Sequence, residues 1–283
     1  MQAEDTSDKE FLEQWLLGRL HEMRSPADFS KGPADVTVLA YHFWAEEESD
    51  ERFRFIEASV RETWRQCGLM KTVLVVDAPP PYAVAFAGDF SPWVDIQVEP
   101  GLVPGQIHTM SVDCNGKLCT RFATSHVLLV QNDGFPLRPG LEDFLGKWDY
   151  IGAPYVRDAW WKRAVCRALG CWVSNGGFSL RTHDICERAA YYWEKKYKDR
   201  GDSHDVTEDL FYTQTLPIRE HDYRRHVHVA DNRSALAFSY DALVPMDCKA
   251  LPFGFHRDCT FAVLQPRLAD TGNVRGASKT EEI

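Results

Sequence analysis

The sequence lacks a long hydrophobic run. Within its 283 residues, no apolar stretch approaches the roughly 18 to 20 residues that a helix needs to cross a bilayer. The first ten residues are acidic, whereas a secretory leader begins basic and continues apolar. We therefore predict no membrane span and expect a soluble protein of the cytoplasm.

An excess of positive charge is also missing. The 32 Lys and Arg residues are outnumbered by 42 Asp and Glu, which gives a formal net charge of -10. Nucleic acids and anionic membranes attract proteins through a concentrated positive field. The composition therefore argues against a nucleic-acid partner, although it leaves room for a local basic pocket that binds a phosphate.

Cysteine pairs of the zinc-binding kind are lacking as well. The eight cysteines are scattered, and none of them shows the C-x2-C spacing of a zinc knuckle. Buried free thiols are the favoured interpretation over disulfides or metal ligands, and they suit a reducing compartment.

Strands and helices alternate through the first half of the chain. Apolar runs at 36–43, 72–77 and 126–130 predict strands, 94–98 is a further short strand, and helices are predicted at 51–66 and 106–123. This alternation is typical of an α/β fold in which a mixed, mainly parallel sheet is flanked by helices. Ligands of such sheets bind beyond the carboxyl ends of the strands.

The domain organisation follows from changes in this pattern. Residues 9–24 carry apolar side chains at helical spacing, so we predict an N-terminal helical extension over 1–34. A single domain follows over 35–265, with short strands at 150–153 and 177–181 and helices at about 182–197 and 206–215 in its second half. The polar stretch 266–283 is predicted to be a disordered tail.

The polar segment Gln131-Asn132-Asp133 directly follows the strand predicted at 126–130. It therefore lies where a parallel sheet presents its ligand site. The Asp133 carboxylate could bind Mg²⁺ or Mn²⁺, which prefer oxygen ligands and bridge diphosphates. A plain Asn-Asp-Gly turn is the alternative, because these residues are common in turns.

Two adjacent glycines, Gly176 and Gly177, follow Asn175 and precede a short apolar strand. Without a Cβ, such residues let the backbone approach a ligand closely. The segment is neither a Walker loop nor a GxGxxG motif, and a structural glycine turn is the alternative.

Paired carboxylates, Glu208 and Asp209, open the helix predicted at 206–215. One of them could act as a general base that takes a proton from an attacking hydroxyl. Acidic residues also stabilise a helix start through the helix dipole, which is the structural alternative.

Four other features are weaker. His256 follows an aromatic, glycine-containing turn and could bind a metal or donate to a phosphate, although a lone histidine is often structural. Trp160–Arg163 is a basic aromatic cluster. His226 and His228 alternate as in a strand, and Asp77 ends a predicted strand where it could meet a nucleobase or ribose.

Taken together, five segments resemble the DUF5672 family in order and spacing, over about residues 35 to 265: 131–135, 149–154, 174–181, 208–209 and 252–256. This family is similar to GT-A glycosyltransferases, so the resemblance implies a GT-A-like domain that transfers a sugar from a nucleotide sugar, with a UDP-sugar as the first candidate, to a hydroxyl of a glycan. Residues 35–135 would bind the nucleotide, and 136–265 would bind the acceptor.

The resemblance also implies roles for individual residues. Asp209 would be the catalytic base of an inverting transfer, with Glu208 in support. Asp133 and His256 would hold a divalent cation or the diphosphate. The donor and acceptor would meet the residues Tyr41, His42, Gln131, Asn132, Asn175, Gly176 and Gly177.

Gln131 departs from the family's Asp-x-Asp pattern, because it replaces the first aspartate. Metal binding should therefore be weak or dispensable. This departure also keeps a non-catalytic sugar-binding or nucleotide-binding module open as an alternative function. A nucleotidyltransferase is the other alternative, although no basic glycine loop occurs near the N-terminus.

Overall fold

The computed structural model describes residues 6–20, 24–43, 46–154, 174–200, 207–241, 251–257, 260–262 and 264. The basic aromatic cluster Trp160–Arg163 and the predicted tail 266–283 lie outside these residues.

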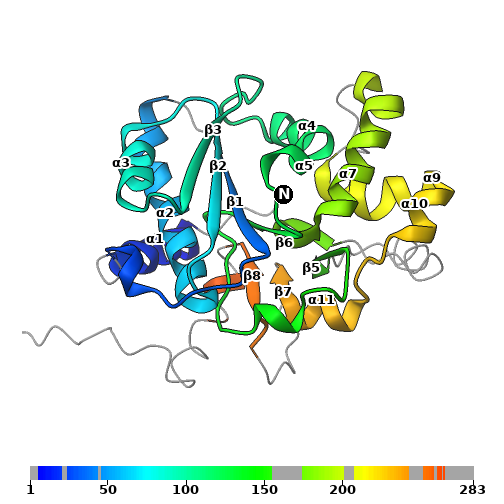
Figure 1. The fold of residues 1–283 in the computed structure, drawn as a ribbon. Coiled ribbons are helices and arrows are strands. Elements are labelled where there is room, and N and C mark those ends of the chain that lie inside the picture. The colour runs from blue at the N-terminus through cyan, green and yellow to red at the C-terminus, as the bar shows by residue number, and fades with distance from the viewer. Residues whose placement is uncertain are drawn as a thin grey trace, which may run out of the picture.

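A six-stranded sheet with the order β3-β2-β1-β4-β6-β5 forms the centre of the fold (Figure 1). Strands β1, β2, β3 and β4 pair in parallel. Strand β6 is antiparallel to both of its neighbours, so β5 runs in the same direction as the first four. The predicted α/β class with a mixed, mainly parallel sheet is therefore confirmed. The bounds are β1 (Val36–His42), β2 (Lys71–Val76), β3 (Val94–Val98), β4 (His126–Val130), β5 (Tyr150–Pro154) and β6 (Ser174–Thr182).

Helices cover both faces of this sheet (Figure 1). One face carries α2 (Glu46–Cys67) and α3 (Pro81–Asp89), and the other carries α4 (Ile107–Gly116), α5 (Leu118–Arg121) and α7 (His183–Tyr192). Successive side chains of a strand point to opposite faces. Val38 of β1 accordingly packs in the α2 core, while the next residue, Leu39, packs in the α4 core.

The N-terminal helix α1 (Thr6–Leu20) packs against α2. The Nε atom of Arg19 lies 3.3 Å from Glu62, and Arg52 lies 3.0 Å from Glu13. Leu12 and Leu16 of α1 are buried in a third apolar cluster. These contacts hold the N-terminal helix on the main domain.

The second half of the described chain is built from short elements. It contains α8 (Glu208–Leu210), α9 (Leu216–Arg219), α10 (His221–His226), α11 (Asn232–Phe238), and the parallel strand pair β7 (Ser239–Asp241) and β8 (Gly254–His256). Two π-helical turns, Trp193–Tyr197 and Phe211–Thr215, continue α7 and α8. Three 3-10 turns, Pro26–Asp28, Leu141–Asp143 and Lys198–Arg200, complete the elements.

Two local predictions differ from the structure. The helix predicted at 106–123 is two helices, α4 and α5, because the backbone at Lys117 leaves the helical conformation (φ -128°, ψ -7°). The strand predicted at His226 and His228 is wrong, since His226 is the last residue of α10. Helix α3, for which the sequence carried no prediction, begins at the last residue of the Pro79–Pro81 run, and proline is well tolerated in the first turn of a helix.

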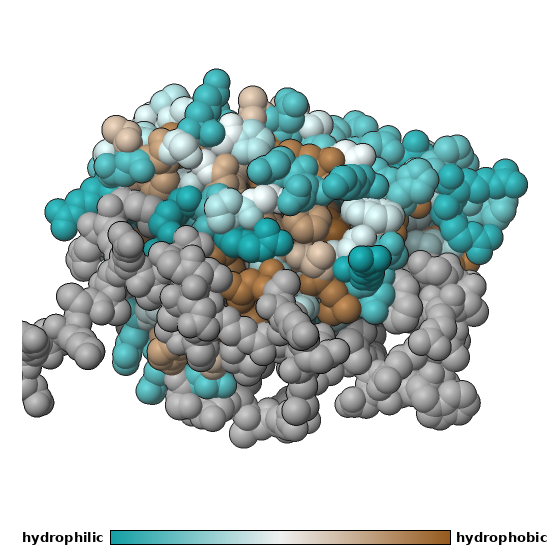
Figure 2. Space-filling model, turned by 90° about the horizontal axis from the view of Figure 1, so that it is seen from below, coloured by the Kyte–Doolittle hydropathy of each residue, from teal (hydrophilic) through white to brown (hydrophobic). Residues whose placement is uncertain are grey.

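The described cysteines Cys67, Cys114, Cys119 and Cys186 are free thiols, as predicted. Burial raises the pKa of the Cys186 thiol to about 12. Among the described residues, no helix is long and apolar enough to span a membrane. On the face seen from below in Figure 1, hydrophobic surface gathers near the middle, and hydrophilic side chains predominate toward one rim (Figure 2).

Candidate functional site

A cavity of about 490 Å³ opens at the carboxyl ends of β1 and β4. The chain leaves β1 toward β2 and β3 on one side and places β4 on the other, so this point is the topological switch of the sheet. Open α/β sheets bind ligands in such crevices. The cavity is lined by Lys9, Leu12, Glu13, Tyr41, Phe43, Phe55, Ile56, Gly105, Ile107, Met110, Gln131, Asn132, Asp133, His256 and Arg257.

Gln131, Asp133 and His256 converge in this cavity, although they come from the end of β4 and from β8. The His256 Nε2 atom lies 3.2 Å from Gln131 Oε1 and 3.7 Å from Asp133 Oδ1. The backbone oxygen of Asn132 accepts a hydrogen bond from Ser59 of α2 at 3.4 Å. Two segments that are far apart in the sequence thus supply one polar wall.

His256 is held from its other side by Asp241 of β7, whose Oδ1 lies 3.6 Å from His256 Nδ1. Asn175 donates to the second oxygen of Asp241 at 2.8 Å, and its own Oδ1 accepts from the Gly177 amide at 2.9 Å. Burial lowers the pKa of His256, but the carboxylates of Asp133 and Asp241 outweigh this effect and raise it. The imidazole therefore sits between two negative groups that favour its protonated form.

Gly176 and Gly177 of β6 allow different side chains to approach the strand closely. A Cβ on Gly177 would lie 2.1 Å from His256 Nε2 and 2.7 Å from Gln131 Oε1. A Cβ on Gly176 would lie 2.0 Å from Glu208 Oε1. Any side chain at either position would displace a predicted site residue, so both close approaches require glycine.

Glu208 and Asp209 lie behind Gly176 and are not among the residues that line the cavity. Glu208 Oε2 accepts from Ser111 of α4 at 3.3 Å, and Ser111 follows the cavity residue Met110. Burial and the neighbouring charge of Glu208 raise the pKa of Asp209 to about 7. Asp209 is thus poised to gain or lose a proton near neutral pH.

Arg181 is a fully buried cation beside this carboxylate pair. Its guanidinium lies between the rings of Tyr150 and Tyr212, 4.9 Å and 4.7 Å from their centroids. Its Nε donates to Ser179 at 3.2 Å, whereas Nη1 and Nη2 have no hydrogen-bond partner among the described residues. The positive charge of Arg181 opposes the rise in the pKa of Asp209.

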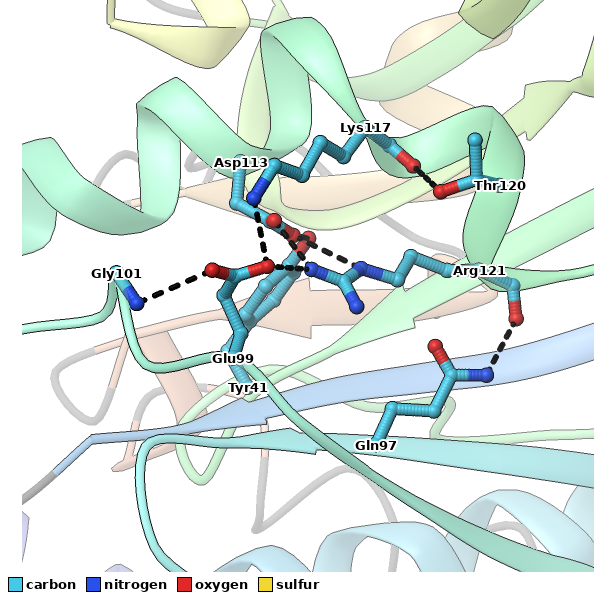
Figure 3. Close-up of polar contacts among 8 residues, drawn as sticks. All are labelled: Tyr41, Gln97, Glu99, Gly101, Asp113, Lys117, Thr120 and Arg121. Atoms are coloured by element: carbon cyan, nitrogen blue, oxygen red, sulfur yellow. Dashed lines mark hydrogen bonds and ion pairs between the residues drawn. The ribbon is translucent and has the colours of Figure 1, made fainter.

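Tyr41 and His42 point to opposite faces of β1. The Tyr41 hydroxyl donates to Asp113 at 2.8 Å, and Arg121 binds both Asp113 and Glu99 (Figure 3). His42 packs edge-on against Phe53 of α2, with ring centroids 5.3 Å apart. Of these two predicted binding residues, only Tyr41 lines the cavity.

The donor set for a divalent cation consists of one carboxylate, one imidazole and one amide, from Asp133, His256 and Gln131. Among the described residues, no group of three His, Cys, Asp or Glu side chains could hold a metal. Asp241 is close to the imidazole, but it faces Nδ1 rather than Nε2. Because Mg²⁺ and Mn²⁺ require several oxygen ligands, these residues alone do not fit a complete metal site.

Several residues around the site carried no recognisable signal in the sequence. Asp241 meets His256 only because β7 and β8 pair. Lys9 reaches the cavity from α1, and Arg257 from the residue after β8. The position of Arg257 directly after His256 is the one local hint.

Fold and cavity define an α/β protein with a cavity, lined in part by polar residues, at the switch point of its sheet. The model of the family "Protein of unknown function (DUF5672)" matches residues 109–256, and the chain belongs to this family. This membership confirms the family predicted from the motifs. A comparison with curated proteins finds no match.

Two solved glycosyltransferase structures overlap with the fold in part. Core-mannan synthase A (CmsA/Ktr4) from Aspergillus fumigatus, in a Mn/GDP form, gives a TM-score of 0.41 with 10% identity over 64% of this chain and 67% of that chain. The apo form of glycosyltransferase GlyE from Streptococcus pneumoniae TIGR4 gives a TM-score of 0.45 with 11% identity. The overlap covers 79% of this chain and 54% of GlyE, so it spans about half of GlyE. Neither overlap is close enough to assign an activity to this chain.

Proposed function

We propose that this protein is a cytoplasmic GT-A-like glycosyltransferase that transfers a sugar from a nucleotide sugar to a hydroxyl group of a glycan. One observation carries the proposal: Gln131, Asp133 and His256 line the switch-point cavity, and Glu208 of the carboxylate pair lies against Gly176, the neighbour of Gly177. A UDP-sugar is the first donor to test.

In this proposal, Asp209 is the general base. A base works best when its pKa lies near the working pH, and burial has moved the pKa of Asp209 to about 7. The acceptor hydroxyl would approach from the α8 side of Gly176 and lose its proton to Asp209 as its oxygen attacks the anomeric carbon. The configuration at that carbon would then invert, and Glu208 would support the base.

The donor diphosphate would lie against the polar wall of the cavity. His256 can donate a hydrogen bond from Nε2 and stabilise the negative charge that develops on the leaving nucleoside diphosphate. The Gln131 amide group can donate to the same ligand. If a divalent cation takes part, Asp133 and His256 would contact it, and the oxygen atoms of the ligand would have to complete its coordination.

A non-catalytic nucleotide-binding or sugar-binding module is the second candidate. It is favoured by Gln131, which replaces an aspartate and whose Oε1 lies 3.2 Å from His256 Nε2. Such a module would bind the nucleotide sugar without turnover. A nucleotidyltransferase has no comparable observation in its favour.

The test is release of a nucleoside diphosphate from a panel of nucleotide sugars and glycan acceptors. We expect turnover with one donor class and a loss of about 100-fold or more in Asp209→Asn, because general-base catalysis is removed. Asp89→Asn is the matched control, since Asp89 is exposed at the end of α3 on the opposite face of the sheet. Turnover by Asp209→Asn at the wild-type rate would remove Asp209 from this role.

A further inference from the structure

Two cationic side chains line the cavity from different parts of the fold. Lys9 comes from the N-terminal helix α1, and Arg257 follows β8 directly after His256. The same cavity is lined by the polar residues Gln131, Asn132 and Asp133. The cavity thus combines two positive groups with the Asp133 carboxylate, which lies 3.7 Å from the His256 imidazole.

The charge of Lys9 is not neutralised within the described part of the chain. No described residue forms a hydrogen bond or an ion pair with Lys9. Glu13, one helical turn further along α1, also lines the cavity, but it is paired with Arg52 at 3.0 Å. Lys9 therefore presents a free ammonium group to a ligand in the cavity.

Arg257 is held in place by unusual backbone geometry. Its φ of 78° lies in the left-handed region, which is uncommon for a residue with a side chain. Its amide donates to the Asp133 backbone oxygen at 2.7 Å, and its Nε lies 2.9 Å from Asp241 Oδ1. Asp241 contacts the Nε atom, and no described residue forms a hydrogen bond or an ion pair with either Nη atom, so both Nη atoms can bind a ligand.

We infer that Lys9 and Arg257 form an anion subsite that binds the diphosphate group of the ligand. A guanidinium can bind two phosphate oxygens at once, and an ammonium group supplies a compact positive charge. The two cations also offset the repulsion between a diphosphate and the Asp133 carboxylate. The N-terminal helix is then part of the binding site, outside the region that the family model matches.

The identity of the anion as a nucleoside diphosphate rests on the proposed function, whereas the anion subsite itself does not. Calorimetric titration with inorganic pyrophosphate and with UDP, in buffer containing EDTA, measures the subsite directly. The variants are Lys9→Met and Arg257→Asn, because asparagine tolerates the left-handed backbone better than most residues. Lys147→Met is the control for loss of a positive charge, since Lys147 is exposed and lies outside the cavity.

We expect each cavity variant to bind both anions about tenfold more weakly than the wild type, which is the loss of one charge-assisted hydrogen bond. Lys147→Met should bind as the wild type does. Unfolding of the unliganded proteins checks that the variants are folded, and Lys9→Met should keep the wild-type midpoint because no described contact depends on its charge.

The outcomes separate this inference from the proposed function. If Lys9→Met binds pyrophosphate and UDP as tightly as the wild type does, the inferred subsite is wrong. The same conclusion follows if the wild type binds neither anion. If pyrophosphate binding depends on Lys9 and Arg257 while no nucleotide sugar is bound or turned over, the subsite holds and the proposed function fails.

Discussion

Two charged clusters lie near the carboxyl ends of the parallel strands, and they differ in how completely their groups are paired. In the first cluster, Asp113 is bound by Tyr41 and Arg121, and Arg121 also reaches Glu99 at 2.6 Å (Figure 3). In the second cluster, His256 lies 3.2 Å from Gln131, 3.7 Å from Asp133 and 3.6 Å from Asp241.

We propose that the first cluster stabilises the fold and that the second binds the ligand. Short, complete pairing of buried charges fixes the packing of helices on a sheet, but it leaves little for a ligand to bind. Longer contacts at the cavity leave donors and acceptors available, and His256 Nδ1 has no hydrogen bond within the described structure. Changes in the first cluster should therefore alter stability, and changes in the second should alter ligand binding.

The largest expected effect is on stability, from Asp113→Asn. Asp113→Asn removes one of the two carboxylates that pair with Arg121 and leaves Glu99 as the remaining partner, at a cost of about 2 kcal/mol. Urea denaturation measures this loss. At temperatures well below the unfolding midpoint of the variant, its dissociation constant for a nucleotide ligand should be close to that of the wild type. A large change in this constant would show that the first cluster also affects ligand binding.

Gly177→Ala should reduce binding about tenfold, because its Cβ would lie 2.1 Å from His256 Nε2 and displace the imidazole. Calorimetry with the preferred nucleotide checks this. Gly88→Ala is the matched control, since nothing lies within 4 Å of a Cβ at that helical position. Unchanged binding by Gly177→Ala would show that the ligand does not depend on the position of His256.

The pH profile of turnover should respond to Glu208. The pKa of Asp209 is raised to about 7 by burial and by Glu208, so activity that needs ionised Asp209 should rise with pH through this range. In Glu208→Gln the rise should move to lower pH, because the neighbouring negative charge is gone. A rise that stays at the wild-type pH would mean that another group controls the profile.

The smallest effect concerns acid stability. Hydrogen bonding to Lys117 and Arg121 lowers the pKa of Glu99 to about 2, from an ordinary value of 4.5. A carboxylate with a lowered pKa stabilises the fold above its ordinary pKa, and this stabilisation is lost as the pH falls toward 2. Glu99→Gln should therefore lose less stability than the wild type between pH 4.5 and 2 in urea unfolding, and an equal loss would count against this ion pair.

Much of the sheet could be predicted from the sequence, because strands buried on both faces are continuous apolar runs. The runs at 36–43, 72–77 and 126–130 correspond to β1, β2 and β4, whereas 94–98 corresponds to the edge strand β3, in which apolar and polar residues alternate. The second half was harder, since short helices, π-helical turns and a two-stranded ribbon have weak periodicity. Trp193 illustrates the difficulty: its ring would lie 2.8 Å from a Cβ on Gly116, a long-range contact that no local pattern reveals.

The site was predictable only where one segment carries its own signal. Gln131, Asp133, Gly177 and His256 were predicted from local motifs, and the structure brings these four together. The positions of Lys9, Asp241 and Arg181 depend on which elements pack together, so no local pattern indicates that they lie near the site. The roles proposed for Asp209 and Glu208 remain predictions.

The central claim is that the cavity at the ends of β1 and β4 binds a nucleotide sugar, and thermal unfolding against a panel of these ligands tests it most directly. A ligand that binds only the native state raises the midpoint, with about 2.7 kcal/mol of stabilisation at a concentration 100 times its dissociation constant. We predict a selective increase with one nucleotide-sugar class for the wild type and a smaller increase for Gly177→Ala. No increase with any nucleotide or nucleotide sugar, with or without Mn²⁺, would contradict the claim.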